Sequence, residues 1–243
     1  MDGLYTALSG LLAETANLTA VAGNLSNLQS PGYLAESGNV EAAISQVVLR
    51  VGGSQGGAIL GQRSAGIVYT NTFDLAPGPI EPTTSPSDLA LNGDGFFAVR
   101  TPSGQVAYTR NGAFTVNAQG NLVLPQGAVL LDTQGNPVTV VPNQPFTVAA
   151  DGTVQQQGAV VGQIAVVALQ PNSVVGLGQA LYQGTPGPSQ ATVVQGGLTQ
   201  SNVSAVVSAE RLLRAESAYQ ALTQVVNAES NRQKTADGLG TLA

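Results

Sequence analysis

Apolar residues at both ends of the chain recur in alternating steps of three and four, and this spacing strongly restricts the fold. Near the N-terminus the repeat runs through Leu4, Leu8, Leu11, Leu18, Ala22 and Leu25, with Thr15 in the remaining position. Near the C-terminus it runs through Leu212, Ala215, Tyr219, Leu222 and Val226. Such a heptad spacing predicts a helix with one apolar seam.

The helix boundaries follow from local signals. Asp2 favours a helix N-terminus, and Pro31-Gly32 is expected to end the first helix. Ser201 or Ser204 is expected to cap a second helix that runs towards Ala236. Two seamed helices at opposite ends pair only if the chain folds back on itself. We therefore expect them to form a coiled coil.

The interior carries the signals of antiparallel β-structure. Short β-branched and aromatic runs begin at Phe96, Val106, Val138 and Ile164, and turn sequences with glycine separate them. The predicted class is mainly β with helical termini, an antiparallel β domain being inserted between the two helices. The expected parts are residues 1–33 (N-terminal helix of the coiled-coil domain), 34–74 (extended Gly-rich linker or hairpin), 75–198 (β-rich central domain) and 199–243 (C-terminal helix of the coiled-coil domain). Gly52 to Gly66 are expected to form a mobile loop or the tip of a hairpin.

The chain is unusually poor in charge. Charged residues are 9% of its 243 residues, against about 25% in typical soluble domains. Between Thr133 and Ala209 the one charged side chain is Asp151. Repeated copies packed against one another tolerate such a surface, because burying an unpaired charge is costly. A β-rich secreted protein of unusual composition is the alternative.

Several kinds of chemistry are excluded. The chain has no histidine and no cysteine, so Ser–His–Asp and Cys–His catalysis and the usual zinc sites are impossible within it. The acids Asp88, Asp94 and Asp151 stand beside turn glycines or strand starts, where Asp serves backbone geometry. Lys234 is the one lysine and the net charge is −6, which argues against nucleic-acid binding. We predict no enzyme activity, catalytic residue, cofactor, metal or small-molecule substrate.

No secretory signal is expected at the N-terminus. Met1 is not followed by a basic region, and Glu14 and Asn17 interrupt the apolar stretch. The longest apolar segment elsewhere, Ile164 to Leu169, is far too short to span a bilayer. If the protein works outside the cytoplasm, another export route is required.

Five segments, in order, resemble one family. Ala22 to Tyr33 is similar to the N-terminal signature of flagellar rod and hook proteins, and Ser201-Asn202-Val203 with Glu210 and Tyr219 is similar to their C-terminal signature. The segments that resemble their β-domain motifs are Asp88 to Phe97, Tyr108 to Phe114, and Asp151 to Val154 with Val161 to Ile164. Gly23 stands where the family usually has Asn, and Ala215 to Ala218 replaces the usual Gln-Arg pattern. The chain length resembles the distal-rod type or its proximal-rod relative, and the choice between them stays open.

The resemblance implies a structural subunit of the flagellar basal body that polymerises through its terminal helices into a tubular drive shaft for motility. The implied partners are copies of itself, other rod and hook subunits, and the flagellar type III export apparatus. The implied location is outside the cytoplasmic membrane, in the periplasm or cell wall, reached without a cleaved signal peptide. The expected subunit-interface residues are Leu4, Leu8, Leu11, Leu18, Asn24, Leu25, Asn27, Ser201, Asn202, Val203, Glu210, Leu212, Tyr219, Leu222 and Val226.

Two other functions predict features that can be sought in the sequence. An exported adhesin-like protein with a β head on a helical stalk would show a cleavable signal or an anchor, and a carboxylate-dependent hydrolase would show a charged cleft. Neither sign is present in the sequence.

Overall fold

The computed structural model describes residues 2–50 and 59–240, with side chains described for 7–38, 70–232, 234 and 235. The described chain divides into two units, a helical unit of residues 2–23, 37–50, 59–71 and 206–240 and a β unit of residues 24–36 and 72–205.

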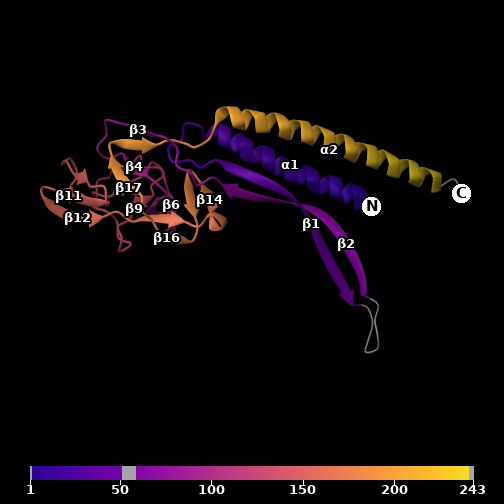
Figure 1. The fold of residues 1–243 in the computed structure, drawn as a ribbon, viewed down its shortest axis with the longest axis horizontal. Coiled ribbons are helices and arrows are strands. Elements are labelled where there is room, and N and C mark those ends of the chain that lie inside the picture. Colours follow the sequence, from indigo (N-terminus) through magenta and orange to yellow (C-terminus); the bar gives the residue numbers. More distant parts are fainter. Residues whose placement is uncertain (1, 51–58, 241–243) are drawn as a thin grey trace. The chain divides into compact units, whose positions relative to one another are not determined.

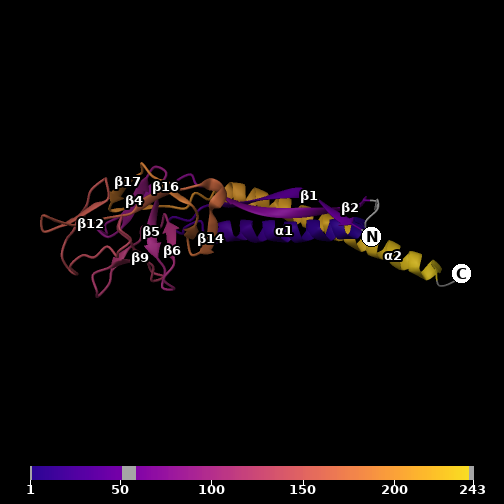
Figure 2. The ribbon, with the colours of Figure 1, turned by 90° about the horizontal axis from the view of Figure 1, so that it is seen from below.

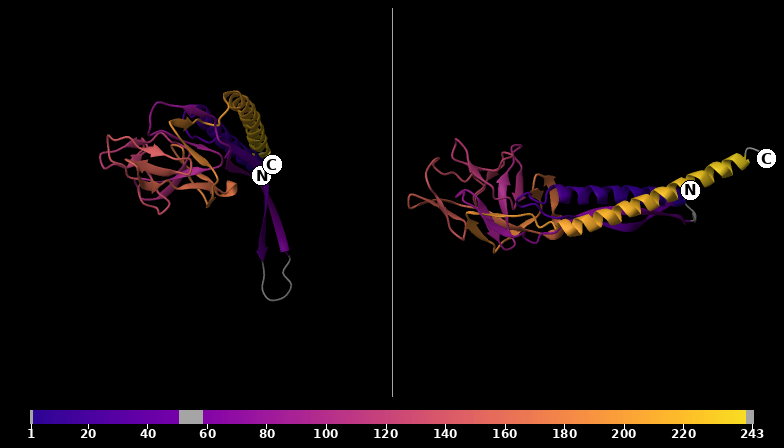
Figure 3. Two further views of the ribbon diagram at one scale, coloured as in Figure 1. Left: turned by 60° about the vertical axis from the view of Figure 1, so that its left-hand side comes forward. Right: turned by 90° about the horizontal axis from the view of Figure 1, so that it is seen from above.

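The helical unit contains both long helices and a long β-hairpin. Helix α1 spans Asp2–Ser26 and helix α2 spans Ala205–Gly240. Strands β1 (Glu36–Arg50) and β2 (Ile59–Phe73) pair as a two-stranded sheet. Within this unit the two helices lie next to each other and run in opposite directions (Figures 1 and 3).

Helix α1 ends where its sequence changes to turn-forming residues. The backbone N–H of Asn27 bonds to the carbonyl of Asn24 at 3.2 Å, and that of Ser30 bonds to Asn27 at 3.1 Å. Two turns therefore close the helix before Pro31, a few residues earlier than the sequence predicts. Neither long helix, nor any other helix in the described ranges, is long and apolar enough to cross a membrane.

The β unit consists of short strands. They are β3 (Ile80–Pro82), β4 (Leu89–Asn92), β5 (Phe96–Arg100), β6 (Val106–Thr109), β7 (Thr115–Val116), β8 (Leu122–Val123), β9 (Val129–Leu130), β10 (Thr147–Val148), β11 (Thr153–Gln156), β12 (Ala159–Gln163), β13 (Val166–Leu169), β14 (Val175–Gly178), β15 (Leu181–Gln183), β16 (Pro186–Pro188), β17 (Thr192–Gln195) and β18 (Gly197–Thr199), with a 3₁₀ turn at Pro171–Ser173. The strand pairs of this unit are antiparallel.

Strand β5 lies at the centre of the largest sheet, which runs β14-β15-β6-β5-β9-β8-β7, and it also pairs with β13. Figure 2 shows β5, β6 and β9 next to one another. Successive side chains of a strand point to opposite faces. Phe97 and Val99 belong to the main apolar core, whereas Phe96 belongs to a second cluster with Leu34, Leu169 and Tyr182. The strand is thus buried on both faces.

One predicted strand is not regular. Val138 and Val140 are buried in the main core, but their backbone N–H groups bond to two different partners, the carbonyls of Leu130 and Gly120. The segment pairs only through isolated bridges. The segment is therefore buried, but the prediction of a regular strand here is wrong.

The predicted class, mainly β with one helix at each end and antiparallel sheets, is confirmed. Coiled-coil pairing and the proposed domain boundaries stay predictions. Of the Gly-rich segment, residues 51–58 lie outside the described part and 59–66 belong to β2.

Candidate functional site: the signature junction, the Arg110 pocket and the helix faces

Three segments far apart in sequence meet within the β unit: residues 24–36, 72–79 and 199–205. We call this region the signature junction. The N–H of Gly32 bonds to the carbonyl of Thr199 at 2.8 Å, and that of Asp74 bonds to Ala35 at 2.9 Å. The segments lead into α1, β1, β2 and α2, so the junction gathers all four chain connections of the helical unit.

Asn24 closes the first segment on itself. Its Nδ2 donates to the carbonyl of Glu36 at 2.6 Å, and its Oδ1 accepts from the N–H of Glu36 at 2.8 Å. The side chain is 2% exposed. Asn24 therefore joins the C-terminal end of α1 to the start of β1 with a pair of bonds like those of a strand ladder.

Asn202 ties the other segments together. Its Oδ1 accepts from the N–H of Ala35 at 2.6 Å, and its Nδ2 donates to the carbonyls of Asp74 and Ala76 at 2.9 and 2.8 Å. An amide supplies both an acceptor and two donors. A single side chain before α2 therefore satisfies backbone groups of both other segments.

Gly32 permits a close approach of two backbones. It has φ +69°, and a Cβ there would lie 2.1 Å from the backbone N of Asn111 and 2.3 Å from the backbone carbon of Arg110. Backbone atoms cannot give way as a flexible side-chain tip does. Glycine is required here both by conformation and by space.

Tyr182 contacts the first two segments of the signature junction. Its hydroxyl accepts a hydrogen bond from the N–H of Leu34 at 2.8 Å, and its ring makes an edge contact with Phe73 at 5.4 Å. Burial raises the pKa of the Tyr182 hydroxyl strongly. Burial also raises the pKa of Glu36.

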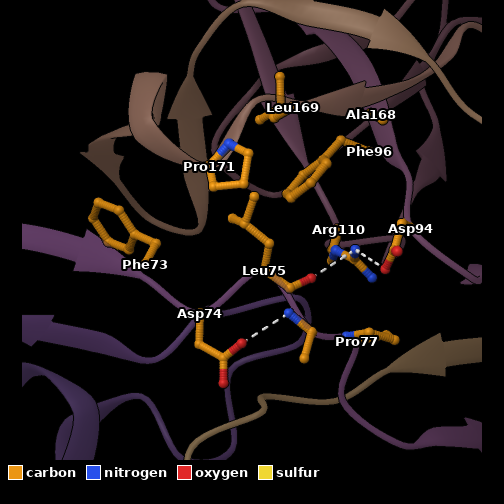
Figure 4. A pocket seen from close by; sticks show the side chains of 11 residues that line it. Phe73, Asp74, Leu75, Pro77, Asp94, Phe96, Arg110, Ala168, Leu169 and Pro171 are labelled. Atoms are coloured by element: carbon orange, nitrogen blue, oxygen red, sulfur yellow. Dashed lines mark hydrogen bonds and ion pairs between the residues drawn. The ribbon is translucent and has the colours of Figure 1, made fainter.

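A pocket of about 550 Å³ lies beside the junction (Figure 4). Its lining is mostly apolar: Phe73, Leu75, Ala76, Pro77, Phe96, Ala168, Leu169 and Pro171, with Asp74, Asp94 and Arg110. The Arg110 side chain is 1% exposed. Its Nη2 donates to the carbonyl of Leu75 at 2.9 Å and its Nη1 to that of Gly93 at 3.3 Å. Desolvation lowers the pKa of Arg110.

The helix faces are sorted by side-chain size. The buried positions of α1 in the helical unit are small or β-branched, namely Ala7, Gly10, Ala13, Ala20 and Val21. Leu8 and Leu12 are 45% and 66% exposed. In α2 the buried positions are Ser208 and Ala215, whereas Leu213 is 66% exposed. Small side chains are thus turned inward and several large apolar ones outward.

Comparison with known proteins places these features in a family. The flagellar basal-body rod protein FlgF of Caulobacter vibrioides is 31% identical over 97% of this chain and 96% of its own length. This chain belongs to the flagellar basal-body rod protein family. The rod protein FlgG of the same organism is 30% identical over 93% of this chain and 95% of its own length. The Escherichia coli rod protein FlgF is 28% identical over 97% of both chains.

A family model described as the flagellar hook protein FlgE/F/G D1 domain matches residues 90–160 of this rod protein. That range contains β5 to β11 and most of the main core of the β unit, whereas Leu89, Ile164, Leu181 and Val193 of that core lie outside it. The expected family is confirmed, and so is the expectation of a structural component rather than an enzyme. Within the described residues, no group of three or more His, Cys, Asp or Glu side chains is arranged to hold a metal ion.

The structure places the expected interface residues of this rod protein in three groups. Asn24, Ser201 and Asn202 are held in the signature junction, where Ser201 Oγ accepts from the N–H of Val203 at 3.2 Å and Ser30 Oγ donates to Asn27 at 3.0 Å. Leu8, Glu210 and Tyr219 are exposed, and Leu11, Leu18, Leu25, Leu212, Leu222 and Val226 are half-buried. The side chain of Leu4 lies outside the described ones. Their role between subunits stays a prediction.

Sequence reasoning missed Arg110, Tyr182 and Gly32. Arg110 stands in a motif used only for family resemblance, and its signal was available: it is one of few cations in a nearly uncharged stretch. Gly32 was used as a helix stop, whereas its close approach to Asn111 depends on a segment about eighty residues away and is visible only in three dimensions.

Proposed function

We propose that this chain is a structural subunit of the flagellar basal-body rod, which polymerises through its terminal helices into a tubular drive shaft for motility. The observation that carries the proposal is the sorting of side chains on the helices. Leu12, Val206 and Leu213 are 66%, 80% and 66% exposed. A surface helix of a soluble globular protein normally turns such residues toward the protein core. Covering them requires a neighbour.

The energetics favour association. Full burial of one aliphatic side chain stabilises by about 1.5–3 kcal/mol. Six large apolar side chains among those described on the helices are more than two-fifths exposed: Leu8, Leu12, Val206, Val207, Leu213 and Val225. Part of this gain offsets the entropy lost on association. Between Thr133 and Ala205 the β unit carries one charged side chain, Asp151, so this part of its surface adds little repulsion between copies.

The remaining expectations belong to the same proposal. Heptad pairing of α1 with α2, subunit contacts through the residues expected from the sequence, and export by the flagellar type III apparatus to the periplasm or cell wall follow from a rod role. Asn24 and Asn202 serve it indirectly, by fixing the segments from which the helices emerge.

The test is a charge placed on the exposed helix face. Leu213→Glu is expected to abolish motility and the recovery of rods in purified basal bodies when it is the only copy in the cell. The matched control, Ala221→Glu, places the same charge at an exposed alanine of α2 and is expected to retain both. The far-UV circular dichroism of the purified monomers should be equal. Normal rods in cells that carry Leu213→Glu would contradict the proposal.

A further inference from the structure

We propose that the pocket at Arg110 is a carboxylate-binding site, filled in the assembled protein by an acidic side chain of a second copy of this chain. The pocket measures about 550 Å³. Its lining residues come from the end of β2 and the segment after it, from β5 and the turn before it, from the residue that follows β6 (Arg110), and from β13 and the turn that follows.

The first argument is an incomplete set of hydrogen bonds. A guanidinium has five N–H donors. Two nitrogens of Arg110 bond to neutral carbonyls, and its Nε is buried without a partner. An unpaired buried donor is costly, and more so on a charged group. Arg110, which lines the pocket, therefore keeps one unused donor next to it.

The second argument is incomplete charge compensation. The acid nearest to Arg110 is Asp94, whose Oδ1 lies 3.9 Å from Nη2, beyond hydrogen-bond length, with an 87% exposed side chain. The face of Phe96, 4.7 Å from the guanidinium carbon, adds only a cation–π contact. Because the Asp94 carboxylate stands in water, solvent and salt screen its attraction to Arg110. A carboxylate brought into the pocket would meet the charge with less screening.

The lining defines the ligand further. Phe73, Leu75 and Leu169 require an apolar body, and Arg110 requires an anionic head (Figure 4). Asp74 also lines the pocket, but its Oδ1 accepts from the N–H of Ala76 at 3.0 Å and its side chain is exposed. An aliphatic carboxylate, as in the stem and head of a glutamate, fits this description.

The choice of a second copy rests on the proposed function, which brings copies into contact. The chain carries fourteen acids against eight bases, so each neighbour brings carboxylates in excess.

The first experiment uses hexanoate as the probe, titrated into the full-length monomer and followed by heteronuclear NMR. Saturable shifts are expected at residues 73–77, 94–96 and 168–171, and hexanol, which has the same apolar stem, should bind at least tenfold more weakly because it lacks the charge. Equal binding of hexanol, or shifts elsewhere only, would overturn the site.

Variants separate a ligand site from a structural cation. Asp94→Asn removes the competing acid and is expected to tighten hexanoate binding by up to about fivefold. Ala168→Phe fills the pocket without touching Arg110 and should abolish binding, while Ala118→Phe, the same change at an exposed turn, should not. Arg110→Gln should also lose binding. Because Arg110 also bonds to the carbonyls of Leu75 and Gly93, this variant can fail to fold; in that case Asp94→Asn and Ala168→Phe provide the test. Unchanged affinity in Asp94→Asn and Ala168→Phe would refute the site.

The occupant is tested in cells. If a second copy fills the pocket, Ala168→Phe should lower the number of complete rods at least severalfold while Ala118→Phe leaves it unchanged. Hexanoate binding together with normal rods in Ala168→Phe would overturn the second copy as occupant and point to a free carboxylate. Failure of the rod role itself would appear separately, as normal rods with Leu213→Glu.

Discussion

At the residue scale, two asparagines hold the places where the chain passes between its units. Asn24 and Asn202 bond to backbone groups of Glu36, Ala35, Asp74 and Ala76. Irregular segments leave backbone donors and acceptors without ladder partners. Side-chain amides fill this need because they present donor and acceptor together.

Replacing Asn202 tests this role. Asn202→Ala removes three hydrogen bonds and is expected to lower the free energy of unfolding by about 2–4 kcal/mol, at about 1 kcal/mol for each bond. Gln200→Ala, two residues earlier, removes one exposed bond to Glu81 and should cost less than about 1 kcal/mol. Urea denaturation followed by circular dichroism measures both. A loss in Asn202→Ala no larger than that in Gln200→Ala would contradict the role of Asn202.

Tyr182 predicts a dependence of stability on alkaline pH. Burial raises the pKa of its hydroxyl above the value of about 10 in an unfolded chain. As the pH rises past about 10, the unfolded state loses this proton first, so the free energy of unfolding falls. Below that pH the hydroxyl is protonated in both states, and Tyr182 adds nothing to the pH dependence of stability. Tyr33 and Tyr108, whose pKa values are also raised by burial, add to the slope.

The comparison is between the wild type and Tyr182→Phe. The variant is less stable at neutral pH because the N–H of Leu34 loses its acceptor, but its stability should fall less steeply between pH 10 and pH 12. Denaturation midpoints measured across that range give the two slopes. Parallel curves would show that Tyr182 ionises alike in both states.

At the element scale, α2 has two different surfaces within one helix. Ala215 is 2% exposed, while Leu213, two residues before it, is 66% exposed. Residues two apart on a helix point to opposite sides. The inward side accepts only small side chains, and the outward side keeps large ones.

Enlarging the inward side should therefore be harmful. Ala215→Leu is expected to lower the stability of the helical unit by about 1–3 kcal/mol through overpacking, whereas Ala221→Leu, at an exposed position of the same helix, should change it little. The helical circular dichroism signal during urea denaturation reports on this unit. Equal midpoints for the two variants would mean that Ala215 is not packed as described.

At the scale of the whole molecule, burial is distributed unequally between the units. The β unit buries two clusters that include Phe96, Phe97, Phe114 and Tyr182. The described side chains buried in the helices are mainly Ala, Gly, Ser and Val. Because apolar area removed from water sets most of the stability, the β unit should hold its structure when the helices open.

Hydrogen exchange of the monomer is the measurement for this prediction. Amides of β5 and β6 are expected to be the most protected, and amides of 2–23 and 206–240 should exchange at least a hundredfold faster, since local opening costs less where few large side chains are buried. A non-specific protease should accordingly leave a core close to the β unit, residues 24–36 and 72–205. Equal protection of helices and strands would indicate that the helices are stably packed without neighbours.

The sequence alone determined the classes of structure and their order along the chain. Heptad spacing from Leu8 to Leu25 and from Leu212 to Val226 predicts helices. Short β-branched and aromatic runs separated by glycine turns predict antiparallel strands. Both patterns depend on local backbone geometry. The predicted run at Phe96 is strand β5, and the one at Val106 is strand β6.

Only the tertiary structure decided which face of each helix turns inward and what the signature residues do. The N-terminal seam runs through leucines, yet Ala7, Ala13 and Ala20 are buried in that helix, and in the C-terminal seam the small Ala215 is buried while Tyr219 is exposed. Packing selects side chains that fit the space available rather than the most apolar ones. Likewise Asn202 meets Ala35 across 167 residues and Arg110 meets Leu75 across 35. Contacts at such separations depend on how the whole chain folds back, and no local pattern encodes that.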